Sequence, residues 1–137
     1  MKKIFISALL VSLALLNLQP INAASAAYAW DCGHMTSKPK SLTIYCADAG
    51  IGLAKLTWSN WGGTTASGVG VYYANNCDPN CAEGKVIQTK VKVTLYQQVM
   101  KSGKKVYAKV KFTTYKGNLP LMHTASGSWT LISKPMA

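Results

Sequence analysis

The chain has 137 residues, with 15 basic and 4 acidic side chains and a formal charge of +11. Every basic residue is a lysine; there is no arginine. Arginine reads guanine and phosphate with a bidentate fork, whereas lysine acts as a point charge. The composition therefore argues against sequence-specific nucleic-acid binding and favours loose attraction to anionic material.

The first residues have the pattern of a secretory signal peptide. Lys2 and Lys3 precede an apolar run of 13 residues, 4–16, which is too short to span a bilayer. The sequence Ala24-Ser25-Ala26 predicts cleavage after Ala26, and Ala27-Tyr28-Ala29 offers a second candidate site. We therefore predict a signal peptide over 1–26 and one secreted domain over 27–137, with no transmembrane segment. An uncleaved membrane anchor is the less favoured alternative.

Four cysteines lie in the predicted exported part: Cys32, Cys46, Cys77 and Cys81. In an oxidising compartment this even number predicts two disulfides. Three pairings are possible, and we favour the local one, Cys32 with Cys46 and Cys77 with Cys81. A zinc site that also uses His34 is the alternative, but export favours oxidised cysteines. We expect neither a metal nor a cofactor.

Residues 27–40 have no clear period, but alternating patterns after them predict short strands. Six strands are expected, at 42–46, 55–59, 69–73, 87–96, 105–115 and 128–133. Turn signals separate them, including Asp48-Ala49-Gly50 and Lys101-Ser102-Gly103-Lys104. We therefore predict an all-β fold, either a small antiparallel sandwich or a barrel.

The same alternation assigns one side of each strand to the core. Gly68 and Gly70 are expected on the outer side of their strand, where glycine indicates a bulge or a backbone that passes close by. The predicted core residues are Leu42, Ile44, Leu56, Trp58, Val69, Val71, Tyr73, Ile87, Val91, Val93, Leu95, Val106, Val110, Phe112, Trp129 and Leu131.

Several motifs resemble a group of small secreted proteins from actinobacteria. They are CADAG at 46–50, LTWSNWG at 56–62, ASG at 66–68 and NCDPNCAEG at 76–84. The pattern of the group is C-(A/G)-D-G-N, L-x-W-x-x-W and N-x-C-x-P-x-C-A-x-G, and the likeness covers about residues 32–84. Here Ala49-Gly50-Ile51 replaces the Gly-Asn of the group. The resemblance implies secretion and a β fold, and it carries no activity.

The hairpin predicted over 87–115 has a basic outer face interleaved with tyrosines. Such a face could dock on an anionic envelope polymer, a polysaccharide or lipid head groups, with tyrosines against sugars. The simpler interpretation is a solvated face whose lysines keep the strands from pairing with other chains. The candidate binding residues, including a tryptophan in a glycine-rich loop, are Lys90, Lys92, Lys105, Tyr107, Lys109, Lys111, Tyr115 and Trp61.

The sequence offers little for catalysis. A Cys32–Cys46 bond could bring Asp31 near Asp48, as two-carboxylate hydrolysis requires, but such residues usually serve turns. No phosphate-binding loop, HExxH motif or nucleophile elbow is present. No catalytic residue is therefore predicted.

Taken together, these patterns predict a secreted, non-enzymatic binding module for anionic envelope or polysaccharide material. One alternative is a secreted inhibitor of an extracellular enzyme, which would present the Cys77–Cys81 loop. A second alternative is a small hydrolase.

Overall fold

A computed structural model describes residues 26–132, which form eight strands and no helix. This result confirms the all-β prediction. The predicted leader lies outside the described residues except for Ala26. The strands are β1 (Ala27–Asp31), β2 (His34–Thr36), β3 (Leu42–Thr43), β4 (Ile51–Asn60), β5 (Ala66–Asn75), β6 (Val86–Lys101), β7 (Lys104–Thr114) and β8 (Ser126–Thr130).

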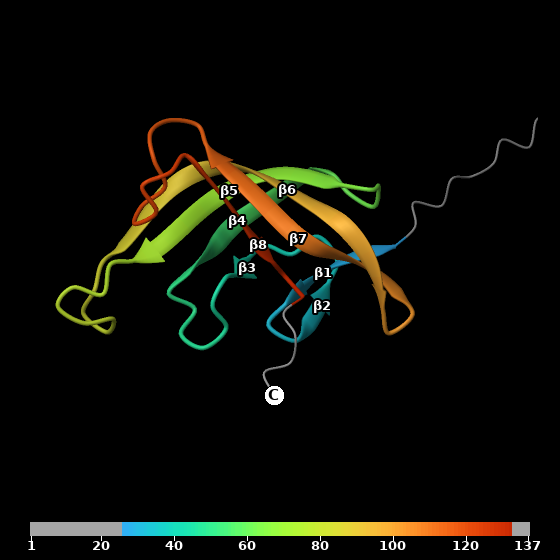
Figure 1. Cartoon of the computed structure of the whole chain (residues 1–137), viewed down its shortest axis with the longest axis horizontal. Coiled ribbons are helices and arrows are strands. Elements are labelled where there is room, and N and C mark those ends of the chain that lie inside the picture. The colour runs from blue at the N-terminus through green and yellow to red at the C-terminus, as the bar shows by residue number, and fades with distance from the viewer. Residues whose placement is uncertain (1–25, 133–137) are drawn as a thin grey trace, which may run out of the picture.

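All eight strands belong to one sheet (Figure 1). Seven of them follow the order β2-β1-β7-β6-β5-β4-β3, and β8 pairs with β7 beside this path. β4 to β7 are consecutive antiparallel neighbours. β7 pairs with β6 along one edge, and two short strands share its other edge. β1 pairs in parallel with Lys105–Tyr107, and β8 pairs antiparallel with Lys109–Thr113. The sheet is therefore mixed rather than purely antiparallel as predicted, because β1 covers an edge that the hairpin leaves open.

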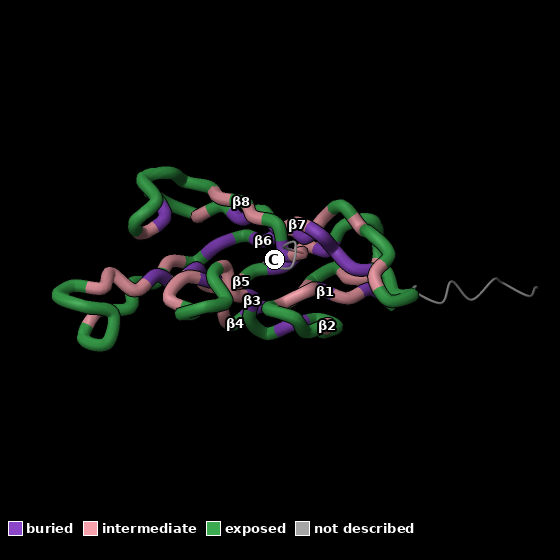
Figure 2. Tube along the Cα trace, turned by 60° about the horizontal axis from the view of Figure 1, so that its bottom comes forward, coloured by how far each residue is buried: buried purple, intermediate pink, exposed green. Residues whose placement is uncertain are grey.

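The two ends of the sheet are tied together. The Cys32–Cys46 disulfide joins the segment after β1 to the segment after β3, with 5.5 Å between the Cα atoms. The Thr43 amide donates to Oδ1 of Asp31 at 2.9 Å, and the Trp61 indole donates to the carbonyl of Ala27 at 3.0 Å. The sheet consequently curls around its core, with buried stretches along the strands and exposed loops at its ends (Figure 2).

Most of the predicted core residues are confirmed. Nine of them are buried, and Ile44, Trp58 and Trp129 are partly buried against the same cluster. The nine are Leu42, Leu56, Val91, Val93, Leu95, Val106, Val110, Phe112 and Leu131. Ile87 is an exception, because it is 41% exposed near the start of β6.

The prediction for β5 is wrong, because its two faces are exchanged. Tyr72 and Ala74 are fully buried, whereas Val69 is 46% exposed. The reason lies in β4, which has a register irregularity between Ala54 and Thr57 and passes close to β5. A Cβ on Gly68 would lie 2.5 Å from the Thr57 carbonyl oxygen, and one on Gly70 would lie 2.7 Å from Cδ2 of Leu56. Glycine at both positions therefore makes room for β4 on the core side.

Both predicted disulfides are confirmed, Cys32–Cys46 and Cys77–Cys81. All four cysteines are thereby paired, and none of those described is free. The zinc alternative is accordingly wrong.

Candidate functional site

Four neighbouring strands present a basic outer surface, which we call the lysine face. Because side chains alternate along a strand, the residues that face the core on β5, β6 and β7 leave their neighbours outside. The lysine face consists of five lysines, two tyrosines and two valines: Lys55, Lys90, Lys92, Lys109, Lys111, Tyr96, Tyr115, Val69 and Val71. Most of these side chains are exposed, while Lys109, Tyr96 and Val71 are partly covered.

No two lysines of the face lie directly opposite each other across a strand pair. Lys92 lies between Val69 of β5 and Thr113 of β7. Lys90 faces Val71, and Lys111 faces Thr94. Like charges placed directly opposite destabilise a sheet, so this stagger lets lysines gather without the worst repulsion.

The lysine face contains no acidic residue. The four carboxylates of the chain lie on other parts of it: Asp31 ends β1, Asp48 is in the turn before β4, and Asp78 and Glu83 are in the loop after β5. The positive charge of the face is therefore not neutralised locally. A surface of one sign raises the local concentration of oppositely charged ligands.

Two tyrosines lie beside lysines of the face. Nζ of Lys92 is 5.3 Å from the ring centroid of Tyr115, and Nζ of Lys111 is 5.7 Å from that of Tyr96. These are cation–π distances, and at exposed sites such contacts are weak. They hold the ammonium groups near aromatic surfaces that are themselves partly exposed.

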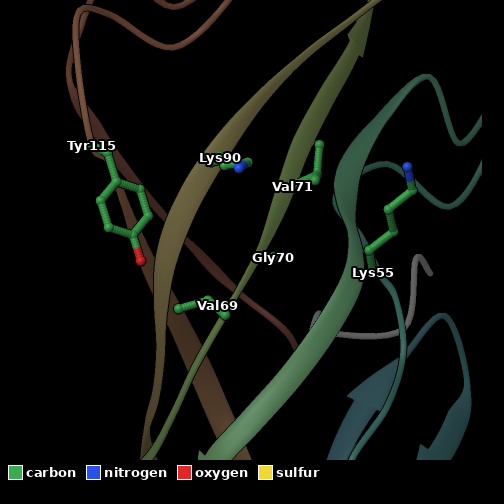
Figure 3. A pocket seen from close by; sticks show the side chains of 6 residues that line it. All are labelled: Lys55, Val69, Gly70, Val71, Lys90 and Tyr115. Carbon is green, nitrogen blue, oxygen red and sulfur yellow. The ribbon is translucent and has the colours of Figure 1, made fainter.

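A shallow groove of about 530 Å³ crosses the middle of the face. Val69, Gly70 and Val71 of β5 line its base, with Lys55 on one side and Tyr115 on the other (Figure 3). A smaller hollow of about 260 Å³ shares Lys55, Val71 and Lys90 and continues to Gln88 and Thr89. The groove therefore combines an apolar base with two lysines, Lys55 and Lys90, and one aromatic ring, that of Tyr115.

Most of the predicted binding residues do share this surface. Lys90, Lys92, Lys109, Lys111 and Tyr115 all lie on the lysine face. Lys105 is exposed but lies at the other end of β7, where its backbone pairs with Ala27.

Tyr107 is not a surface residue, so the prediction that it points outward is wrong. It is 0% exposed, and its hydroxyl donates to the carbonyl of Gly63 at 2.8 Å. The β1 strand covers this end of β7, and the Trp61 ring packs edge-on against Tyr107 at 5.4 Å.

Trp61, predicted as an exposed contact, is instead partly buried and packed against the core. Its ring also lies 4.9 Å from that of Trp58. The tryptophan motif of the sequence thus closes the structure near β1 and contributes little free aromatic surface.

Alternation alone does not identify the groove: it places Lys55 correctly on the outer side of its strand but puts two of the other lining residues in the core. These two are Val69 and Val71. Lys55 lies at the irregularity in β4 and has a positive φ of 51°, which a regular strand pattern does not predict. The sequence feature that could have placed the valines outside is the pair Gly68 and Gly70. Glycine in a strand often marks a side where another backbone passes close by, and here that is the core side.

Two of the four carboxylates accept hydrogen bonds from backbone amides that fix the local structure. Oδ1 of Asp31 accepts from the Thr43 amide, and Oδ1 of Asp48 accepts from the Gly50 amide at 3.1 Å. Both histidines, His34 and His123, are exposed. No carboxylate or histidine lines the groove, and residues 26–132 contain no group of three potential metal ligands.

The loop after β5 has a fixed shape. The Cys77–Cys81 disulfide closes it, and Oδ1 of Asn75 accepts from the Cys77 amide at 2.9 Å. Oδ1 of Asn80 accepts from the amides of Ala82 and Glu83, both at 3.0 Å. Short polar side chains that bond to nearby backbone are typical of tight turns.

Two tyrosines of β5 have altered acidity. Burial raises the pKa of Tyr72, and the neighbouring Tyr45 raises it further. Burial also raises the pKa of Tyr73, with a smaller contribution from the negative charge of Asp31. Both phenols therefore stay protonated to higher pH than in an unfolded chain.

Comparison with protein-family models, with curated proteins and with solved structures found no match for this chain. The resemblance to small secreted actinobacterial proteins stays a prediction. Within residues 26–132, no helix is present that could span a membrane.

Proposed function

We propose that this protein is a non-enzymatic binding module that acts outside the cytoplasm and holds an anionic polysaccharide on its lysine face. The observation that supports this most directly is a face of five lysines with no carboxylate among them, which contains an apolar groove lined by two of those lysines, Lys55 and Lys90. The predicted leader and the two disulfides support an oxidising, extracytoplasmic setting.

The shape of the face favours an extended polymer. Lys90 and Lys92 of β6 are two residues apart on one side of a strand, a spacing of about 7 Å, and Lys109 and Lys111 repeat it on β7. A chain with regularly spaced carboxylates or phosphates can meet several lysines at once. Lysine ammonium groups impose little directional preference, so they suit an anionic chain of variable geometry.

The groove supplies the contacts that charge alone does not. The exposed sides of Val69 and Tyr115 offer apolar and aromatic surface to the carbon face of a sugar ring. Five of the nine residues of the face are lysines, which favours a charged sugar polymer over insertion into lipid.

Retention on an immobilised carboxylated polysaccharide, polygalacturonate, tests the proposal. We expect the protein to bind at about 20 mM salt and to elute before about 0.5 M, because screening shortens the reach of exposed charges. Replacing Lys109→Glu together with Lys111→Glu should abolish retention at low salt.

The matched control replaces Lys38→Glu together with Lys85→Glu, two exposed lysines away from the face. Both variants have the same net charge, so only the position of the change differs. Equal loss of retention in the two variants would show a net-charge effect and would contradict the proposal, as would retention by the Lys109 and Lys111 variant. Stronger binding to anionic lipid vesicles than to the polysaccharide would identify a membrane surface instead.

A second candidate function, inhibition of an extracellular enzyme, is supported by the exposed and internally bonded Cys77–Cys81 loop. A preformed loop binds with a smaller loss of conformational entropy. A panel of secreted hydrolases would test it: inhibition that vanishes after Pro79→Gly with Asn80→Ala, but survives Lys109→Glu with Lys111→Glu, would favour this candidate. Absence of inhibition across the panel would count against it.

A further inference from the structure

The opposite side of the sheet carries a second concave site, which we call the aromatic pocket. Its volume is about 270 Å³, and it lies where the β3–β4 turn, the loop after β7 and β8 converge on the core. Nine residues line it: Ile44, Tyr45, Ile51, Tyr72, Phe112, Leu121, Met122, Ser128 and Trp129. None of them is charged, in a chain whose formal charge is +11.

Three aromatic rings of the pocket are held by one another. Tyr72 stacks on Phe112 with centroids 5.5 Å apart, and Phe112 meets Trp129 edge-on at 5.0 Å. Gly127 of β8, two residues before Trp129, lies directly against the ring of Phe112. A Cβ on Gly127 would clash with that ring, so only glycine allows this contact. The rings therefore form a rigid surface before any ligand arrives.

The wall formed by the loop after β7 is also fixed in place. The Tyr72 hydroxyl donates to the carbonyl of Pro120 at 3.3 Å. Within the loop, the Leu119 amide donates to the carbonyl of Thr124 at 2.6 Å, and the Met122 amide donates to the carbonyl of Leu119 at 3.1 Å. Leu119 itself is 2% exposed, which anchors the loop in the core. The pocket is thus largely preformed, as ligand sites usually are.

Large apolar side chains surround the opening. Tyr45 is 58% exposed, Leu121 is 52% exposed and Met122 is 38% exposed. Leu121 also has a φ of +63°, a backbone region that leucine rarely adopts. Asparagine or glycine would fit that backbone better, so leucine at this position is explained by its place beside the pocket rather than by the turn.

The chemistry of the lining defines the ligand class. An apolar cavity of about 150 Å³ takes up benzene, and this pocket is larger, so a second ring fits. The hydroxyls of Tyr45 and Ser128 can serve one polar group, since the Tyr72 hydroxyl already donates to Pro120. We propose that the aromatic pocket binds an uncharged aromatic compound of about two fused rings with a single polar group.

Titration with 1-naphthol, followed by nitrogen–proton NMR of the oxidised chain without its leader, tests the proposal. We expect saturable shifts with half-saturation at about 1 mM or below. The shifts should be confined to the Trp129 indole and to residues of the β3–β4 turn, the loop after β7 and β8. The lysine face should not respond, so this outcome is independent of the proposed function.

Leu121→Asn provides the decisive variant. It suits the positive φ, so the melting temperature should stay unchanged or rise, while affinity for 1-naphthol should fall by about fivefold because an apolar wall is lost. The matched control, Lys109→Glu with Lys111→Glu, should bind 1-naphthol normally.

Two results would overturn the inference. One is a linear, non-saturating response to 1-naphthol, or shifts spread over the whole sheet. The other is self-association: a monomer–dimer equilibrium in sedimentation that Leu121→Asn abolishes would show that a second copy of the chain covers the pocket.

Discussion

Gly68 shows how a missing side chain can shape this sheet. Valine and isoleucine are enriched in strands, yet here glycine faces the core because the Thr57 carbonyl of β4 comes too close for a Cβ. The two valines nearby, Val69 and Val71, are consequently displaced to the outside. That displacement creates the apolar base of the groove on the lysine face.

We predict that Gly68→Val destabilises the protein by about 1–3 kcal/mol or more, because overpacking forces backbone shifts. Urea unfolding followed by tryptophan fluorescence would measure it. The control is Gly63→Ala, where the nearest atom to the added Cβ is 3.5 Å away. That variant should stay within about 0.5 kcal/mol of the parent. Equal stability of the two variants would refute the close approach of β4.

At the same scale, the raised pKa values of Tyr72 and Tyr73 predict sensitivity to alkali. Because the pKa of each tyrosine in the folded chain lies above the ordinary value of 10.0, the contribution of both residues to stability is complete below pH 10 and is lost as pH rises above it. Urea unfolding from about pH 8 to about pH 11 should show this loss. Tyr73→Phe should make the free energy of unfolding fall less steeply with pH. An unchanged slope would contradict the raised pKa of Tyr73.

Among the elements, the β6–β7 hairpin could be predicted well and β1 could not. Strict alternation from Lys90 to Leu95 identifies both the buried and the basic side of β6. Residues 27–40 lack a period because β1 and β2 are short and their partners are set by tertiary contacts. Alternation also places Tyr107 on the outside, because the pattern of β7 gives no sign that the distant Trp61 ring and the Gly63 carbonyl contact it.

The place of β1 favours one of the two cleavage sites predicted for the leader. Cleavage after Ala29 would remove Ala27, Tyr28 and Ala29, the residues of β1 that pair with β7. Ala27 and Ala29 are each 0% exposed, and Ala27 accepts the Trp61 indole hydrogen bond. We therefore expect cleavage after Ala26.

Intact-mass analysis of the exported protein should give a chain that begins at Ala27 with all four cysteines oxidised. A chain that begins at Trp30 would contradict this prediction. As a control, a version produced from Trp30 onward should be less stable by at least about 2 kcal/mol, because it loses buried apolar surface and a strand.

At the scale of the whole molecule, the two disulfides differ in how much of the structure they connect. Cys32–Cys46 spans 14 residues and ties the two ends of the sheet, whereas Cys77–Cys81 spans 4 residues within one loop. Replacing Cys32 and Cys46 by serine should cost about 3 kcal/mol on the loop-entropy model, and replacing Cys77 and Cys81 should cost less. Denaturant unfolding of both variants would measure the difference. A larger loss from the Cys77 and Cys81 variant would contradict this account of the sheet ends.

The shared edge of β7 also determines when the sheet can be completed. β1 lies near the beginning of the described chain, yet it pairs with residues that follow 78 positions later, from Ala27 to Lys105. Contacts so distant along the chain form late. A nascent polypeptide therefore keeps its first strand unpaired with β7 until β7 has been synthesised. The segment directly after the predicted leader therefore has no partner on β7 during that time, which suits passage of the leader and this segment through a narrow translocation channel.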